Sequence, residues 1–156
     1  MAPETTYQPV VTPVAAKPIA AVAARVRPEQ MGEVVFKALD SVHAALRTGT
    51  WGPYWGDVVM CEGEDDGVLD LRIGVGVARD FPGLGAVSPW RTPAGEAVQV
   101  THLGPWSERG LAHAAARDGA ARLGRRLTGV HWEVHGLFMP EARARRTDVF
   151  YEASDA

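Results

Sequence analysis

A chain of 156 residues with 46% apolar and 22% charged residues can form one domain with a substantial core, and its composition is that of a soluble globular protein. The formal charge of −3 argues against a nucleic-acid-binding surface, since turns and helix ends explain the arginine clusters at 122–126 and 143–146 more simply. The single cysteine, Cys61, excludes an intrachain disulfide and a cysteine-based structural zinc site.

The sequence shows neither a targeting signal nor a membrane-spanning segment. The N-terminus has no basic region followed by an apolar stretch, and no apolar run approaches the length that crosses a bilayer. We therefore expect a cytoplasmic protein without a membrane or nucleic-acid partner. The single cysteine fits a reducing compartment.

The first half of the chain predicts a leader, a strand and a helix. Residues 1–17 contain three prolines and few large apolar side chains, which indicates a flexible or extended leader. Ile19–Val26 has a weak strand pattern. Pro28 then opens a helix that stops at Gly49. The apolar positions of this helix repeat every 3.6 residues and are Met31, Val34, Val35, Leu39, Val42 and Leu46.

Two strands joined by a tight hairpin follow. The first is expected at Asp57–Glu62, and Asp66-Gly67 ends a hairpin loop. The second, Val68–Val77, alternates clearly between apolar and other residues. Gly74 and Gly76 share the face opposite the apolar one and leave room for a loop or a ligand against the backbone.

The same order of elements recurs after residues 78–94, which are rich in Pro and Gly and indicate a connector. Ser107 is a plausible N-cap of a helix that runs to about Gly124. The strands expected around this helix are Ala97–Leu103, Val130–Gly136 and Asp148–Ala153.

The two halves thus predict an α+β fold made of two βαββ repeats, 18–77 and 95–154, within a single domain of residues 18–156. In a βαββ unit, one sheet face is covered by the helix. Two such units related by a pseudo-twofold axis can enclose a cleft between them. That cleft is the expected ligand site.

Glu133 is the most informative residue for function. Residues 130–135 alternate as in a half-buried strand, so Trp132 faces one side while His131, Glu133 and His135 face the other. A carboxylate among aromatic rings suits an apolar cation, because charge pairing adds to the attraction of the ring faces. A solvated glutamate paired with an arginine is the alternative, and a buried partner is expected in either case.

A metal site at this strand is not expected. The Cα atoms of His131 and His135 lie roughly 13 Å apart on an extended strand, too far for both side chains to reach one ion at bonds of about 2 Å. His102 is interpreted as a structural histidine and Cys61 as a buried filler without an activating partner. No cofactor is expected.

Many of the aromatic residues lie next to Gly or Pro, in or beside loops. Any one of them is expected to pack over its own loop, but as a set they exceed what the core needs. We therefore expect at least two to line the cleft, and Trp132 to lie in the core. The set is Trp51, Tyr54, Trp55, Trp90 and Trp106.

Three segments carry a resemblance to a known family. Pro93-Ala94-Gly95-Glu96 followed by His102-Leu103-Gly104-Pro105-Trp106, the strand Trp132-Glu133-Val134-His135, and the strand Arg146–Tyr151 resemble motifs of the GyrI-like small-molecule-binding family. The sequence departs from these motifs at His135 and Trp106, where tyrosine is usual. These departures bear on ligand preference.

The resemblance implies a two-repeat ligand-binding domain like those of MerR-type and AraC-type multidrug regulators. It places Glu133 in the cleft, against cationic aromatic drugs. No helix-turn-helix segment is visible, so a stand-alone member is expected. The expected ligand-binding residues are Glu133, His131, His135, Trp55, Tyr54, Trp90, Trp106 and Tyr151.

Three functions remain open at this point. The first is a protein that senses or sequesters planar, hydrophobic or cationic small molecules. The second is a hydrolase that opens the cyclopropane ring of electrophilic natural products, as some relatives do, with Glu133 as a general base of raised pKa and Tyr54, Tyr151 or a histidine positioning the substrate. It ranks below binding, because no complete nucleophile–base–orienter set is visible. The third is an inhibitor of a protein partner such as DNA gyrase.

Overall fold

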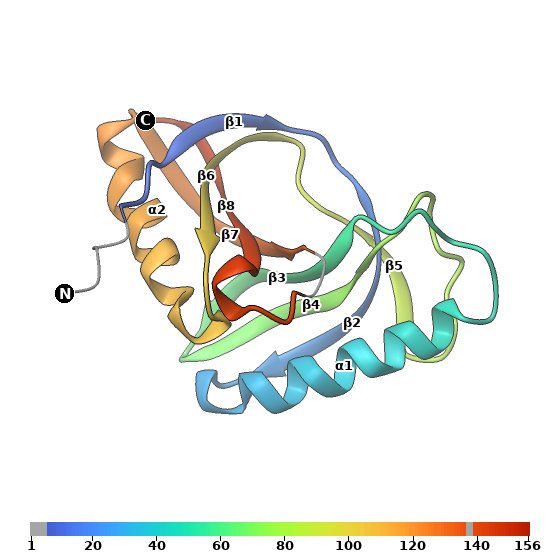
Figure 1. The fold of residues 1–156 in the computed structure, drawn as a ribbon. Coiled ribbons are helices and arrows are strands. Elements are labelled where there is room, and N and C mark those ends of the chain that lie inside the picture. Colours follow the sequence, from blue (N-terminus) through green and yellow to red (C-terminus); the bar gives the residue numbers. More distant parts are fainter. Residues whose placement is uncertain (1–5, 137–138) are drawn as a thin grey trace.

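Eight strands in one antiparallel sheet, with two helices packed on one face, make up the residues that the computed structural model describes, 6–136 and 139–156 (Figure 1). The fold class is therefore α+β, as predicted. The strands are β1 (Val10–Val14), β2 (Pro18–Val26), β3 (Gly56–Asp65), β4 (Val68–Gly76), β5 (Val87–Arg91), β6 (Gly95–Leu103), β7 (Arg125–His135) and β8 (Arg146–Asp155). The helices are α1 (Met31–Leu46) and α2 (Gly110–Arg122), with short 3-10 turns η1 (Pro28–Gln30), η2 (Trp106–Glu108) and η3 (Ala142–Ala144).

The strand order β1-β6-β8-β7-β3-β4-β2-β5 contains the two predicted repeats. The units β2-α1-β3-β4 and β6-α2-β7-β8 meet at the β7–β3 pair, and the order of their strands reads the same outward from that pair. The hairpin turn of the first repeat is as predicted, because Asp66 and Gly67 both adopt positive φ. The pseudo-twofold axis therefore passes between β3 and β7.

The outermost strands are exchanged between the repeats. β1 precedes the first repeat but pairs with β6 of the second, and β5 precedes the second repeat but pairs with β2 of the first. Each exchange gives an otherwise open sheet edge a partner. The two repeats are thereby tied into one sheet.

This exchange corrects two predictions. The leader 1–17 contains the ordered strand β1, and the connector 78–94 contains β5. Both strands are short and carry a proline, which edge strands tolerate and which hid them in the sequence. The start of α2 also differs, because Ser107 lies in η2 and Arg109 is the N-cap.

Both helices pack on the face of the sheet that carries Glu133. α1 covers β2 and β4, while the small residues Ala112, Ala116 and Ala120 let α2 lie close over β6 and β8. The opposite face has its own apolar cluster, which includes Trp132 as predicted. The central strands β3 and β7 thus lie between the two helices. No helix among the described residues is long and apolar enough to cross a membrane.

Candidate functional site

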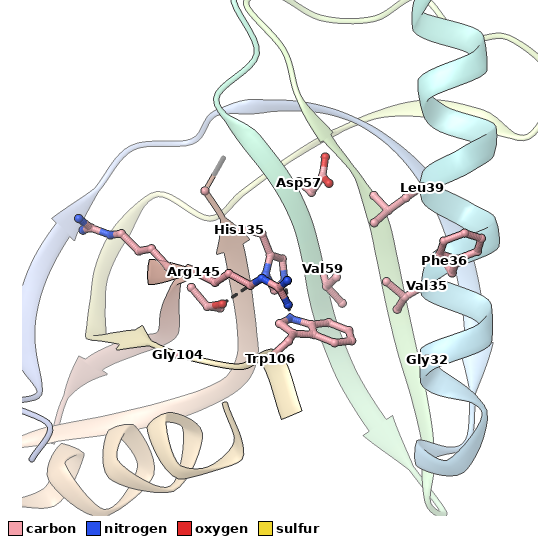
Figure 2. A pocket seen from close by; sticks show the side chains of 13 residues that line it. Gly32, Val35, Phe36, Leu39, Asp57, Val59, Gly104, Trp106, His135 and Arg145 are labelled. Carbon is pink, nitrogen blue, oxygen red and sulfur yellow. Dashed lines mark hydrogen bonds between the residues drawn. The ribbon is translucent and has the colours of Figure 1, made fainter. Parts of the chain in front are cut away.

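Two adjoining cavities lie over the central strands, between α1 and α2. The Trp106 cavity has a volume of about 380 Å³ and is mostly apolar (Figure 2). The Tyr151 cavity has a volume of about 530 Å³ and carries more charged groups. Val59 of β3 borders both. The first is lined in part by Val35, Phe36, Leu39, Trp106 and His135, and the second by Met31, Arg109, His113, Arg117, Glu133 and Tyr151.

Glu133 lines the Tyr151 cavity beside Val59, the residue that borders both cavities. Its cross-strand neighbours are Val59 on β3 and Val149 on β8, so a carboxylate occupies the middle of an apolar row. The residue is only 4% exposed. A carboxylate at this depth needs partners from its own chain or from a ligand.

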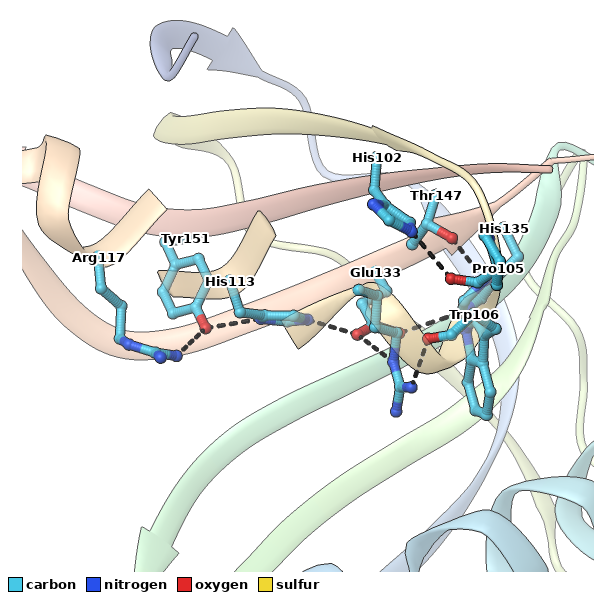
Figure 3. A network of polar contacts seen from close by, with 10 residues as sticks. His102, Pro105, Trp106, His113, Arg117, Glu133, His135, Thr147 and Tyr151 are labelled. Atoms are coloured by element: carbon cyan, nitrogen blue, oxygen red, sulfur yellow. Dashed lines mark hydrogen bonds and ion pairs between the residues drawn. The ribbon is translucent and has the colours of Figure 1, made fainter. Parts of the chain in front are cut away.

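Three donors surround the Glu133 carboxylate (Figure 3). Nε2 of His113 and Nε of Arg109 (3.0 Å) both donate to Oε1, and Nε2 of His135 donates to Oε2 at 3.1 Å. The predicted buried partner is confirmed, as a set of three. The glutamate charge is therefore already compensated within the protein.

The protonation of His135 follows from this arrangement. The indole N–H of Trp106 also lies 3.3 Å from His135 Nε2, but that nitrogen cannot donate to Glu133 and accept from Trp106 at once. The carboxylate is the stronger acceptor, so we assign the proton to Nε2. Nδ1 then accepts from the hydroxyl of Thr147 at 3.3 Å.

The pKa of Glu133 is lowered. Burial acts to raise it, but the hydrogen bonds from His113 and His135 and the charges of His113 and Arg109 outweigh burial and hold it well below its ordinary value. The raised pKa that would help Glu133 act as a general base is therefore not found. The carboxylate stays ionised and is a weak base.

A hydrogen-bonded chain continues from Glu133 along the floor of the Tyr151 cavity. Nδ1 of His113 lies 2.7 Å from the hydroxyl of Tyr151, and Nη1 of Arg117 donates to the same hydroxyl at 3.1 Å. Burial raises the pKa of Tyr151, and the nearby Arg117 opposes that effect. In the neutral form of His113 that carries its proton on Nε2, Nδ1 accepts a hydrogen bond from the Tyr151 hydroxyl. The order Glu133–His113–Tyr151 is that of a carboxylate, an imidazole and an acid in a proton relay.

Arg109, which bonds to Glu133, also stacks on the aromatic ring of Trp106. The guanidinium carbon of Arg109 lies 3.7 Å from the ring centroid of Trp106, and Nη1 of Arg109 donates to the Trp106 carbonyl at 3.0 Å. The turn that carries Trp106 is itself fixed by His102, whose Nε2 donates to Pro105 O at 2.9 Å. His102 is 1% exposed and structural, as predicted.

Comparison with known proteins adds structural relatives only. No protein-family model and no curated protein matches the sequence. The solved C-terminal domain of EcmrR matches with a TM-score of 0.80 and 14% identity over 97% of this chain and 100% of that domain, and SAV2435 bound to tetraphenylphosphonium matches with 0.71 and 9% over 94% of each chain. The chain has the GyrI-like fold. This confirms the family resemblance at the level of the fold.

Other solved structures with a similar fold have names that state different roles. A longer EcmrR chain, solved in a complex with DNA, has a TM-score of 0.80, and this chain spans 58% of its length. A hydrolase from Listeria innocua has a TM-score of 0.56 and 17% identity over 98% of this chain and 94% of that one. The GyrI-like fold is thus shared by proteins of different named roles.

Five of the predicted site residues come together in the GyrI-like cleft. Glu133, His131 and Tyr151 border the Tyr151 cavity, while Trp106 and His135 border the Trp106 cavity. The ring of His131 stacks on the ring of Tyr151, with centroids 4.6 Å apart. No group of three His, Cys, Asp or Glu side chains in the described ranges could hold a metal ion.

The other three predicted residues lie elsewhere. Trp55 packs on the opposite sheet face, where its ring covers Gly76 and its N–H donates to Val77 O at 3.1 Å. Trp90 of β5 bonds to Glu62, and Tyr54 is exposed and borders neither cavity. Only Trp106 of the loop aromatics reaches the cleft, so the expectation of at least two is wrong.

Three functional residues were not found from the sequence. Arg109, His113 and Arg117 are spaced four apart and line the Tyr151 cavity from α2 and its N-cap. This spacing places them on one helix face, which was a usable signal. Cys61 also borders that cavity, where burial raises the pKa of its thiol, in keeping with an unreactive filler.

Proposed function

We propose that this protein binds planar, hydrophobic or cationic small molecules in the cleft between α1 and α2, in a sensing or sequestering role. The observation that carries the proposal is the apolar Trp106 cavity beside a buried, ionised glutamate. Apolar walls recognise shape and surface, and the carboxylate adds a preference for positive charge.

The size and composition of the cleft support this role. A cavity of about 380 Å³ lies within the range of small-molecule sites. Val35, Leu39 and Val59 offer apolar surface opposite the indole of Trp106, and Phe36 is exposed at its edge. Apolar surface dominates its lining, although Asp57, Arg145 and Arg146 also border it. A mostly apolar lining favours loose rather than exclusive specificity.

Solved structures with the same fold support the class of ligand. Tetraphenylphosphonium, the compound bound to SAV2435, is a hydrophobic aromatic cation. The ligand proposed for the present cleft has the same chemistry.

Fluorescence titration tests the proposal with N-methylacridinium, a planar cation, and acridine, its uncharged analogue at neutral pH. We expect micromolar binding of the cation, weakened about tenfold in Glu133→Gln, with less effect on acridine. Glu152→Gln removes the same charge from β8 on the opposite sheet face and is the matched control. Absence of binding for both dyes would refute the function.

A second candidate, hydrolysis of an electrophilic strained ring, is favoured by the Glu133–His113–Tyr151 chain. In such a reaction the oxygen of water bonds to the ring carbon and the ring C–C bond breaks. The electron pair moves into the conjugated carbonyl of the substrate, which takes a proton. The Tyr151–His113 pair would accept the proton that water loses and return one to that carbonyl, while Glu133 orients His113.

Turnover separates this candidate from binding alone. Conversion of a cyclopropane-containing alkylating compound to its hydrated product, followed by mass spectrometry, should fall by about a hundredfold or more in Tyr151→Phe. The phenylalanine keeps the ring stacked on His131. Binding without any product in the wild type leaves the first function and removes the second.

A further inference from the structure

Arg109 makes the contacts that a cationic ligand would be expected to make. It donates to the Glu133 carboxylate at 3.0 Å, its guanidinium lies 3.7 Å from the Trp106 ring centroid, and it donates to the Trp106 carbonyl at 3.0 Å. A carboxylate and a ring face are the two attractions proposed for the ligand. An amino acid of the protein already occupies that position.

The acceptor sites of Glu133 are almost used up. Oε1 accepts from both His113 and Arg109, and Oε2 accepts from His135. A carboxylate oxygen has two lone pairs, so a single acceptor position remains on Oε2. A cation that pairs fully with Glu133 therefore has to replace one of the present donors.

Arg109 is the donor that can leave. The two imidazoles are each fixed by a second side chain, His113 by Tyr151 and His135 by Thr147. Arg109 stands at the N-cap of α2 on a long flexible stem, and its other contacts are with the ring and the main-chain carbonyl of Trp106 rather than with a second polar side chain. When displaced, its guanidinium moves into water and regains hydration.

We propose that Arg109 is an internal counter-ion which a cationic ligand displaces, and that this exchange sets the ligand specificity of the cleft. The proposal rests on the proposed binding function. Displacement exchanges one cation for another at Glu133, so the net gain has to come from apolar surface buried in the adjoining Trp106 cavity. The favoured ligands are therefore planar, charge-delocalised aromatic cations. Small, strongly hydrated ammonium ions and neutral molecules leave Arg109 in place.

The central test is the affinity of Arg109→Met for matched dyes. This variant keeps an apolar stem and removes the competing charge, while His113 and His135 still bond to Glu133. We expect N-methylacridinium to bind roughly tenfold to a hundredfold more tightly to this variant. If Arg109 leaves Glu133 in only a few per cent of wild-type molecules, the apparent affinity of the wild type is lowered by about that factor. Acridine affinity should stay unchanged, and methylammonium, a small and strongly hydrated cation, should not bind the wild type.

Two further variants control for charge and geometry. Arg122→Met removes the same charge from the exposed last turn of α2 and should leave both affinities unchanged. Arg109→Lys keeps the charge but loses the planar stacking on Trp106, so its cation affinity should lie between wild type and Arg109→Met. Equal or weaker cation binding by folded Arg109→Met would overturn the proposal while leaving the binding function intact.

A second measurement uses the unaltered protein, in case Arg109→Met does not fold. The Nε–H resonance of Arg109, assigned by its loss in Arg109→Lys, should report the ion pair with Glu133. Saturation with N-methylacridinium should move it to the position of a solvated arginine, and acridine should not. A resonance unchanged at saturation would also overturn the exchange. If neither dye binds wild type or variants, the binding function itself fails and this proposal with it.

Discussion

His131 and Tyr151 are cross-strand partners on β7 and β8, and their rings stack with centroids 4.6 Å apart and planes 11° from parallel. The stack buries the imidazole beside the candidate site. Burial, with a smaller contribution from the charge of His113, lowers the pKa of His131 from 6.5 to about 4. A histidine that is kept neutral in this way makes folding depend on pH.

The first prediction concerns that dependence. Between pH 6.5 and about 4 the unfolded chain binds a proton at His131 and the folded protein does not, so stability falls as the pH is lowered through this window. The full difference corresponds to about 3 kcal/mol. His131→Phe keeps the stack and should lose less stability than wild type over the same window. Urea unfolding at several pH values measures this, and parallel curves for the two proteins would contradict it.

The second prediction concerns Gly76, where the predicted room against the backbone is filled by the protein itself. A Cβ atom at this position would lie 2.1 Å from the Trp55 ring. Gly76→Ala should therefore destabilise the fold by about 2–3 kcal/mol through overpacking. Gly63→Ala, where no atom lies within 4 Å, is the matched strand control. Equal melting temperatures for the two variants would show that Trp55 moves freely.

A third prediction links the N-terminal segment to the cleft. The hydroxyl of Tyr7 bonds to Nδ1 of His102 at 2.8 Å, and His102 holds the turn that carries Trp106. Tyr7→Phe leaves a buried ring nitrogen without its partner and should cost about 1–2 kcal/mol of unfolding free energy. Exposed Tyr54→Phe should be neutral. A neutral Tyr7→Phe would mean that the segment before β1 does not stabilise the turn.

The repeated architecture was predictable because local patterns carry it. Alternation in β4 and the Asp66-Gly67 turn are encoded within a few residues. The edge strands β1 and β5 were missed because their stability comes from pairing with the other repeat, which leaves little local pattern.

The candidate site was predictable only in part, because some of its residues are placed by local alternation and others by tertiary packing. Side chains alternate between the two faces of a strand, so the sequence predicted that His131, Glu133 and His135 lie on the same face. Which way Trp55 turns depends on a tertiary gap over Gly76, and no local pattern reports that. His113 and Arg109 reach Glu133 only because α2 crosses β7 at this height, although their spacing gave a signal.

The last prediction concerns the balance that keeps Glu133 ionised. Burial raises its pKa and is the largest single influence, while His113 supplies the strongest opposing hydrogen bond together with a charge. His113→Phe should therefore raise the pKa of Glu133 above that in the wild type. A carboxylate whose pKa is lowered by folding stabilises the folded protein at pH values above its pKa in the unfolded chain, and this stabilisation is lost as the pH falls. The variant should therefore have less of this stabilisation at neutral pH. The carboxyl carbon shift of Glu133, assigned with Glu133→Gln, measures the pKa by NMR. Exposed His43→Phe is the control, and an unchanged Glu133 pKa in His113→Phe would show that Arg109 and His135 suffice to keep the cleft charged.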